Sequence, residues 1–135
     1  MKRRRFLAFS VPALLTTVAG CSSRESGGEA LTIAVLELEN LSDEEVVFDV
    51  AVVDTAGETV FETAQPVAGN AAVALDHPVA EPGDYTITLT TGGQNARQDI
   101  SLFAADGDSC VRITGRRTQA RQLQVSGIGY NDCPS

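Results

Sequence analysis

The stretch Tyr85-Thr86-Ile87-Thr88-Leu89-Thr90 decides the fold class, because it has the most regular alternation of apolar and polar residues in the chain. Successive side chains of a β-strand point to opposite faces. Tyr85, Ile87 and Leu89 are therefore expected to face a core, while the threonines face solvent. Just before this stretch, Glu81-Pro82-Gly83-Asp84 places Pro and Gly at the central positions of a type II turn.

Short segments of the same kind recur on both sides of this strand. Gly92-Gly93 marks a tight hairpin turn after it, and residues 65–70, with Pro66 and Gly69, are expected to form a loop. Seven or eight strands without a helical pattern are typical of an antiparallel sandwich. The predicted strands are residues 31–39, 46–53, 59–62, 71–75, 85–90, 96–103, 110–114 and 122–126.

Three of these strands carry more specific expectations. In residues 31–39 the apolar positions change face after Val35, which predicts a bulge or a strand that switches sheets. Residues 46–53 are apolar on both faces, as in a central strand. In residues 96–103, Ile100 and Leu102 are expected to face inward.

The eight residues from Pro82 to Leu89 resemble the late strand of immunoglobulin-like domains, in which a Tyr at the start of the strand bonds back to the backbone. The chain departs from that family because it contains no Trp. The resemblance implies an all-β, immunoglobulin-like sandwich over residues 31–135.

The first 20 residues have the organisation of an export signal. Residues 2–5 are all basic, and residues 6–18 form a mostly apolar run of thirteen. A helix that spans a membrane needs about 20 apolar residues, so this run has instead the length of a signal-peptide core. Arg3 and Arg4, followed by Arg5-Phe6-Leu7, fit the twin-arginine signal, which is read by a receptor and serves a route that exports folded proteins.

Val18-Ala19-Gly20-Cys21 looks like a lipobox, in which small residues fit a peptidase and the Cys accepts a lipid. We therefore expect residues 1–20 to be removed, Cys21 to be lipidated and residues 21–30 to form a flexible tether. A diacylglyceryl group supplies the two chains that stable anchoring needs. The alternative is an ordinary secretory signal with an incidental Cys. The predicted location is the extracytoplasmic face of the cell membrane.

The formal charge of the chain becomes more negative once residues 1–20 are removed. Removal of residues 1–20 leaves six Arg, no Lys and all 18 acidic residues, a formal charge of −12. Such a surface repels nucleic acid, which binds clustered Lys or Arg. A Lys-free acidic surface with twin-arginine export looks like a halophilic archaeal lipoprotein, because molar salt screens the self-repulsion. That resemblance implies location and not activity.

Two cysteines remain after Cys21. An even pair in an exported chain favours a disulfide between Cys110 and Cys133. The alternative is a redox or metal-binding pair, but the chain lacks a C-x-x-C motif.

Two features suggest modification or binding. Asn40-Leu41-Ser42 fits the N-glycosylation sequon and is expected in a loop at the end of a strand. Residues 115–121 are expected to form a loop that holds half of the remaining basic residues, Arg116, Arg117 and Arg121. This loop is either a partner contact or a means of neutralising neighbouring carboxylates.

Catalytic and metal chemistry find little support. A copper site of the cupredoxin type needs two His, a Cys and usually a Met, whereas His77 is the only His and Met1 the only Met. The chain lacks the G-x-S-x-G motif of many hydrolases. Asp106-Gly107-Asp108 has only a fragment of a calcium loop and is expected to be a turn. We predict no enzyme activity, no cofactor, no metal and a monomeric protein.

The function expected from the sequence is that of a lipid-anchored, non-enzymatic binding module at the cell surface. A structural envelope protein and an accessory subunit of a transporter or membrane enzyme are the alternatives. Fold class alone does not choose between them.

Overall fold

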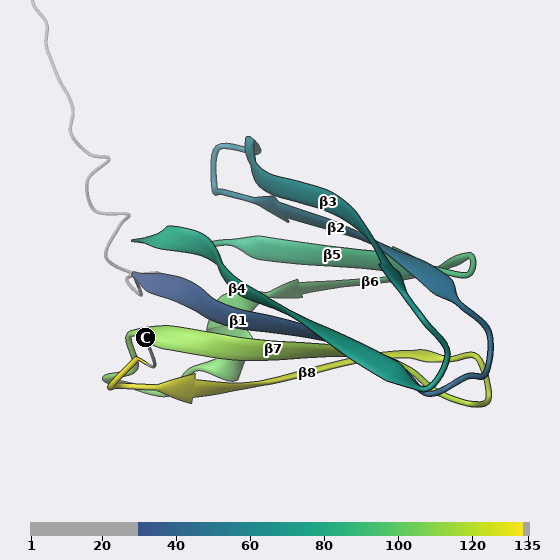
Figure 1. The fold of residues 1–135 in the computed structure, drawn as a ribbon. Coiled ribbons are helices and arrows are strands. Elements are labelled where there is room, and N and C mark those ends of the chain that lie inside the picture. The colour runs from purple at the N-terminus through teal and green to yellow at the C-terminus, as the bar shows by residue number, and fades with distance from the viewer. Residues whose placement is uncertain (1–29, 134–135) are drawn as a thin grey trace, which may run out of the picture.

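The computed structural model describes residues 30–133, which form two packed β-sheets (Figure 1). One sheet has the strand order β4-β1-β7-β8 and the other β3-β2-β5-β6. The predicted all-β sandwich is thereby confirmed. The elements are β1 (Leu31–Asn40), β2 (Val46–Val53), β3 (Thr59–Val67), β4 (Ala71–Gly83), β5 (Thr86–Thr91), β6 (Gln94–Asp99), the 3-10 helix η2 (Ile100–Phe103), β7 (Cys110–Arg117) and β8 (Leu123–Tyr130).

The predictions about the export signal, Arg3, Arg4, Cys21 and the tether concern residues that lie outside the described range, apart from residue 30. Within residues 30–133, no helix has the length and apolar character needed to cross a membrane.

The core lies between the two sheets and is built by the alternation that the sequence shows. Tyr85, Ile87 and Leu89 are buried on β5, while the Thr residues between them are half-buried on the outer face. β2 pairs with both β3 and β5, so the prediction of a central strand is confirmed. The largest fully buried side chains are Phe48, Leu31, Ile33, Leu36, Leu38, Ile87, Leu89, Ile100 and Ile113.

A bulge in β1 explains the change of phase in its sequence. The register shifts between Ile33 and Val35 in the pairings with both β4 and β7. Ile33, the adjacent Ala34 and then Leu36 are all buried, because the extra residue returns the apolar side chains to the core face. The predicted bulge is confirmed.

His77, on the neighbouring strand β4, has a φ of 49°, a left-handed conformation uncommon for a residue other than Gly.

One of the six strand pairings is parallel, which the sequence pattern did not predict. β1 and β7 run in the same direction, and the other five pairings are antiparallel. After η2 the chain crosses from the second sheet to the first and enters β7 beside the start of β1 (Figure 1). The two strands are joined on their outer face by an ion pair of 3.1 Å between Arg112 and Glu37.

Tyr85 forms the corner that the resemblance to immunoglobulin-like domains implied. Its hydroxyl donates a hydrogen bond of 2.7 Å to the backbone oxygen of Glu81. Burial, together with the charges of Glu81 and Asp54, raises the pKa of Tyr85, so its hydroxyl stays protonated and remains a donor.

The predicted type II turn before Tyr85 is wrong. β4 continues to Gly83, whose φ is not positive. Gly83 is needed for space instead, because a Cβ atom there would lie 2.9 Å from the Tyr85 hydroxyl oxygen.

Asp84, next to this corner, is held in an environment that disfavours its charge. Burial raises the pKa of Asp84 from its ordinary 3.8, and the nearby charge of Asp99 raises it further. The folded protein therefore binds this proton more tightly than the unfolded chain does. The stability gained from protonation is complete below the ordinary pKa and is lost as pH rises through the raised value.

We therefore expect Asp84→Asn to raise the melting temperature at pH 7 and low salt, because the variant lacks the disfavoured charge. Its advantage over the wild type should fade as the pH falls below about 4. Thermal unfolding between pH 3 and pH 8 measures both effects. Asp106→Asn, which removes an equal charge from an exposed turn, is the matched control. An equal gain in both variants would show that net charge alone is responsible.

Two predicted boundaries are wrong. The returning strand β3 extends to Val67, although residues 65–70 were expected to be a loop. Pro66 is tolerated because β3 is an edge strand, where a missing N–H group costs no ladder hydrogen bond. β6 ends at Asp99 and η2 follows, so Ile100 is buried as expected while Leu102 is 70% exposed. The 3-10 helix repeats about every three residues, and it turns Phe103 rather than Leu102 toward the core.

The disulfide between Cys110 and Cys133 is present, with Cα atoms 5.8 Å apart. Cys110 begins β7 and is fully buried, whereas Cys133 is exposed. The bridge ties the segment after β8 to the end of the sandwich where β1 begins (Figure 1).

Candidate functional site

Four connections between strands gather at one end of the sandwich, which we call the distal end (Figure 1). Residue 30, the β2–β3 turn, η2 and Cys133 lie at the opposite end, which we call the tether end. Strands of eight to ten residues separate the two ends by about 30 Å. The distal end consists of residues 41–45, 68–70, 92–93 and 118–122.

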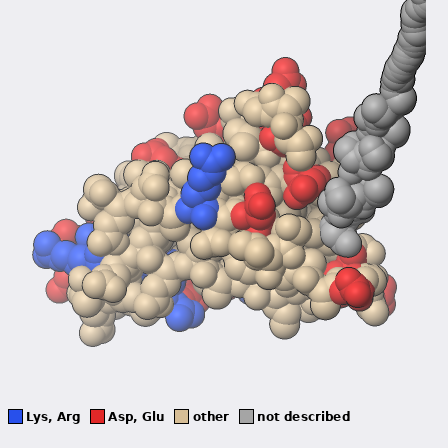
Figure 2. All heavy atoms as spheres, turned by 180° about the vertical axis from the view of Figure 1, so that it is seen from behind, with Lys and Arg blue, Asp and Glu red and all other residues tan. Residues whose placement is uncertain are grey.

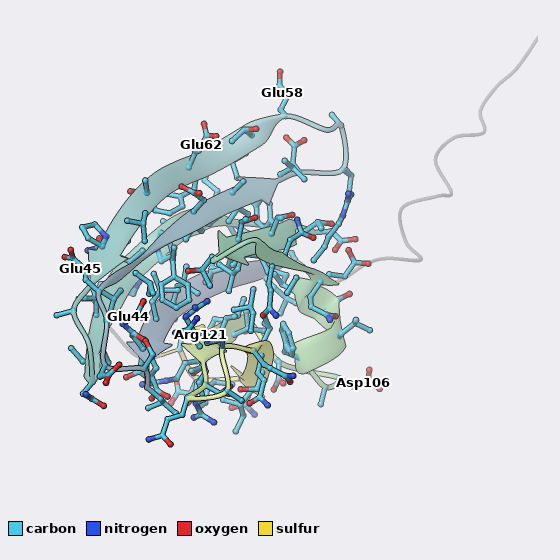
Figure 3. All side chains as sticks on the ribbon, turned by 90° about the vertical axis from the view of Figure 1, so that its right-hand side faces the viewer. Glu44, Glu45, Glu58, Glu62, Asp106 and Arg121 are labelled. Carbon is cyan, nitrogen blue, oxygen red and sulfur yellow. A yellow bond between two sulfur atoms is a disulfide. The ribbon has the colours of Figure 1, made fainter. Side chains whose placement is uncertain are left out.

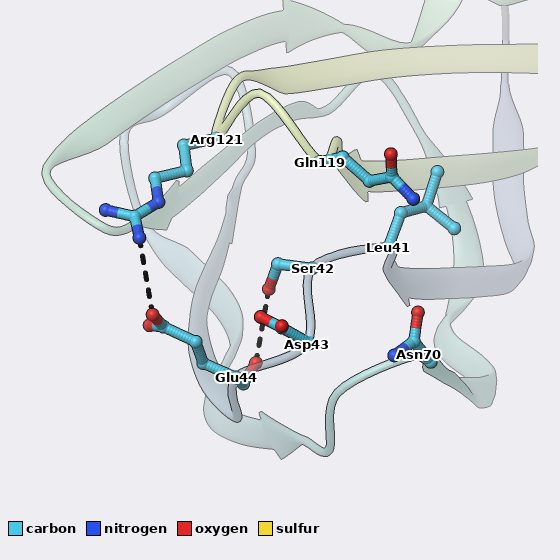
Figure 4. Close-up of a pocket in the computed structure, with 7 residues that line it drawn as sticks. All are labelled: Leu41, Ser42, Asp43, Glu44, Asn70, Gln119 and Arg121. Atoms are coloured by element: carbon cyan, nitrogen blue, oxygen red, sulfur yellow. Dashed lines mark hydrogen bonds and ion pairs between the residues drawn. The ribbon is translucent and has the colours of Figure 1, made fainter.

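A pocket of about 330 Å³ opens at the distal end (Figure 4). The β1–β2 connection contributes four lining residues, the β3–β4 turn one and the β7–β8 hairpin two. Three segments far apart in sequence thus build one concave surface. The lining residues are Leu41, Ser42, Asp43, Glu44, Asn70, Gln119 and Arg121.

The β7–β8 hairpin holds Arg121 at the pocket by local hydrogen bonds. Thr118 donates its N–H to Gln122, and its own carbonyl accepts the N–H of Arg121, both at 2.9 Å. This closure gives Arg121 a φ of 66°, and Asn70 across the pocket has a φ of 58°. Asn tolerates this left-handed conformation well, whereas for Arg it costs about 1 kcal/mol.

Asn40 lies beneath the pocket and fixes the connection that forms its wall. Its Nδ2 lies within 2.7–3.2 Å of the carbonyl oxygens of Glu44, Val67 and Ala68. Its Oδ1 accepts hydrogen bonds from the N–H and the hydroxyl of Ser42, at 3.0 and 2.6 Å. Asn40 therefore joins β1, the β1–β2 connection and the end of β3.

The same geometry bears on glycosylation at Asn40. The residue has no exposed surface, and its Nδ2 is used by carbonyl groups. A glycan on Nδ2 therefore requires that it be attached before the domain folds. The twin-arginine route exports folded proteins, so these two predictions from the sequence are incompatible unless glycosylation precedes folding.

The arginines expected to contact a partner have different environments. Arg116 Nε lies 2.7 Å from Glu39 Oε1, and Arg121 Nη2 lies 3.3 Å from Glu44 Oε2. The Arg121–Glu44 pair is exposed and contributes less than about 1 kcal/mol, whereas the Arg116–Glu39 pair is partly buried. Figure 3, which views the distal end, shows Arg121 beside Glu44. These two pairs fit the alternative in which the arginines neutralise neighbouring carboxylates.

The expected loop at residues 115–121 is shorter than predicted, because β7 continues to Arg117 and the turn spans residues 118–122. Gly115 and Arg117 thereby point into the sandwich. Only 7% of Arg117 is exposed, so this residue is not a surface contact in the structure.

The pocket presents hydrogen-bond donors and acceptors together. Asn70 and Gln119 carry amides, Arg121 a guanidinium and Asp43 a carboxylate. Leu41 adds apolar surface and is 40% exposed. This mixture resembles the polar and apolar groups found together in protein–protein interfaces.

Among the charged residues beyond residue 20, acidic side chains outnumber basic ones by 18 to six. Figure 2 shows one face, where Asp and Glu are spread and few Arg lie between them. Asp106 and Asp108 lie in the expected turn, where Asp108 Oδ2 accepts the N–H of Ala105 at 2.7 Å. In the part of the chain that the structure describes, no three His, Cys, Asp or Glu side chains converge as metal ligands would.

Comparison with known proteins adds a distant structural similarity. No family model matches the chain, and no curated protein matches it. Among solved structures, the NMR structure of a protein from Eubacterium rectale is similar, with 15% sequence identity and a TM-score of 0.39. The match covers 73% of this chain and 88% of that one.

Proposed function

We propose that the protein is a non-enzymatic binding module, anchored by lipid on Cys21 to the extracytoplasmic face of the membrane, whose distal end contacts a protein partner. The observation that carries this proposal is the opposition of the two ends. The chain joins the sandwich at residue 30, and the pocket lies about 30 Å away at the other end.

Anchoring and binding are separated in this arrangement. A tether at residues 21–30 holds the tether end near the membrane and directs the distal end away from it. The pocket then faces a partner, to which Asn70 and Gln119 present their side-chain amides and Arg121 presents a guanidinium that also pairs with Glu44. A purely structural envelope role does not require such a concave polar surface.

The test is site-specific photo-crosslinking of the full-length, membrane-anchored protein. A photoreactive residue replaces Gln119 at the distal end or, as a matched control, Ala56 in the exposed β2–β3 turn at the tether end. We expect one dominant partner at position 119 and much weaker capture at position 56. Equal capture at both positions, or none at 119, would contradict a distal binding surface and favour the envelope role.

The anchor is tested separately by Cys21→Ser. We expect this variant to be released into the medium, because the lipid is its only stable attachment to the membrane. Fractionation and immunoblotting measure the released share. A variant that stays with the membrane would contradict the lipid anchor without bearing on the pocket.

A further inference from the structure

Arg117 is a buried cation without a partner among the described residues. Its Nε and Nη1 have no accessible surface, and neither donates a hydrogen bond within residues 30–133. Arg112, Arg116 and Arg121 each pair with a Glu. Arg117 is therefore the exception among the arginines of β7 and the hairpin that follows it.

No carboxylate of residues 30–133 forms an ion pair with Arg117. Its guanidinium packs against the β5–β6 turn so closely that a Cβ atom on Gly92 would overlap Nη1. The hydroxyl of Thr91, which precedes this turn, is also buried without a partner in the described part of the chain. Asn40, the residue paired with Arg117 across β1 and β7, commits its side-chain oxygen to Ser42.

Such an arrangement is costly in free energy. The Nε and Nη1 groups lose their hydration and gain no hydrogen bond in return. Buried polar atoms without partners in native proteins usually mark a bound water or ion. A guanidinium favours groups that accept hydrogen bonds and carry negative charge, and this attraction is strong where water is excluded.

We propose that Arg117 and Thr91 form a binding site for one small anion at the distal end, taken as a free halide or carboxylate or as the carboxylate of a partner. The anion accepts hydrogen bonds from the guanidinium and from the Thr91 hydroxyl. Since Nε and Nη1 are covered, the β5–β6 turn shifts to admit it. Gly92 and Gly93, both with positive φ, make up that turn.

The test measures how the stability of the full-length protein in detergent depends on sodium chloride and, separately, on sodium acetate. Arg117→Met is compared with Arg116→Gln, which removes an equal charge from a half-buried position on the same strand, where the side chain pairs with Glu39. Both variants lose one positive charge, so the general effect of ionic strength on their stability is comparable. Thr91→Val, a change of similar volume, is a second variant that keeps the guanidinium.

If the ligand is a free anion, the free energy of unfolding should rise with anion concentration in the wild type and in Arg116→Gln. The rise should be smaller in Arg117→Met. Above the dissociation constant, each tenfold increase in anion should multiply the folding equilibrium constant about tenfold. At the lowest salt, Arg117→Met should melt above the wild type, because it lacks the unpaired charge, and this order should reverse at high anion. In Thr91→Val, the same gain in stability should require a higher anion concentration. Hydrogen exchange at residues 92–93 should change with the anion.

For a carboxylate from a partner, the free protein should show no specific anion dependence, but Arg117→Met should lose the crosslink at position 119 that Arg116→Gln retains. Equal anion dependence in all variants together with unchanged crosslinking would overturn the site. The anion arm needs no partner, so its result is independent of the proposed binding function.

Discussion

Asn40→Asp is expected to lower the free energy of unfolding at pH 7 by about 3–5 kcal/mol, the range for an uncompensated buried charge. The substitution keeps the shape of the side chain but replaces an NH2 group with an oxygen. That oxygen would face the carbonyl oxygens of Glu44, Val67 and Ala68 at 2.7–3.2 Å. The NH2 donor is thus replaced by an acceptor, and the new carboxylate charge lies at a position with no exposed surface.

Urea unfolding of wild type and variant measures this difference. Asn70→Asp, an exposed change at the rim of the pocket, is the control and should cost less than about 1 kcal/mol. The loss in Asn40→Asp should shrink at low pH, because burial favours the neutral acid and its protonation restores a donor. A cost equal to that of Asn70→Asp would show that the Asn40 hydrogen bonds do not stabilise the distal end.

Cys133→Ser is expected to lower the free energy of unfolding by about 3 kcal/mol, because it removes the crosslink that closes the segment between Cys110 and Cys133. For a domain of this size, such a loss corresponds to a melting temperature lower by roughly 12–24 °C. Cys133 is exposed, so its replacement breaks the bridge without leaving a cavity in the core.

Thermal unfolding with and without a reducing agent checks this expectation. Reduced wild type should melt close to Cys133→Ser, and the reducing agent should leave the variant unchanged. Ser109→Ala, an exposed change beside the bridge, should leave both curves in place. A wild type that melts at the same temperature when reduced would show that the bridge does not constrain the unfolded chain.

The sequence predicts a structural feature correctly where that feature depends on residues close together in the chain. The alternation from Tyr85 to Leu89, the Gly92-Gly93 hairpin and the bulge near Val35 could all be predicted, because each is fixed by side-chain periodicity or by backbone conformation. The Tyr85 corner could be predicted because its hydrogen bond spans only four residues.

Prediction from the sequence failed where contacts with residues distant in the chain determine the conformation. Pro66 remains in a strand because its strand lies at a sheet edge, and Gly83 is required by the ring of Tyr85 rather than by a turn. Leu102 is exposed because a 3-10 helix interrupts the alternation after Asp99. None of these facts is present in the residues themselves.

The candidate pocket could be predicted only in part. Arg121 was expected at a contact surface, and it lines the pocket. Asn70 and Gln119 had no signal in the sequence, because their position depends on three connections that meet only in the folded domain. The sequon did draw attention to Asn40, but its polar pair with Ser42 serves an internal network rather than an accessible loop.

The parallel pairing of β1 with β7 also determines when the domain can complete its folding. β1 lies between β4 and β7, and the contact between Glu39 and Arg116 joins residues 77 positions apart. The hairpins of the second sheet can form as the chain emerges from the ribosome, whereas the first sheet lacks half of its strands until residues 110–130 have been synthesised. A nascent chain that stops before β7 leaves one edge of β1 unpaired, and such edges recruit other chains. The closure of so long a loop is slow compared with hairpin formation.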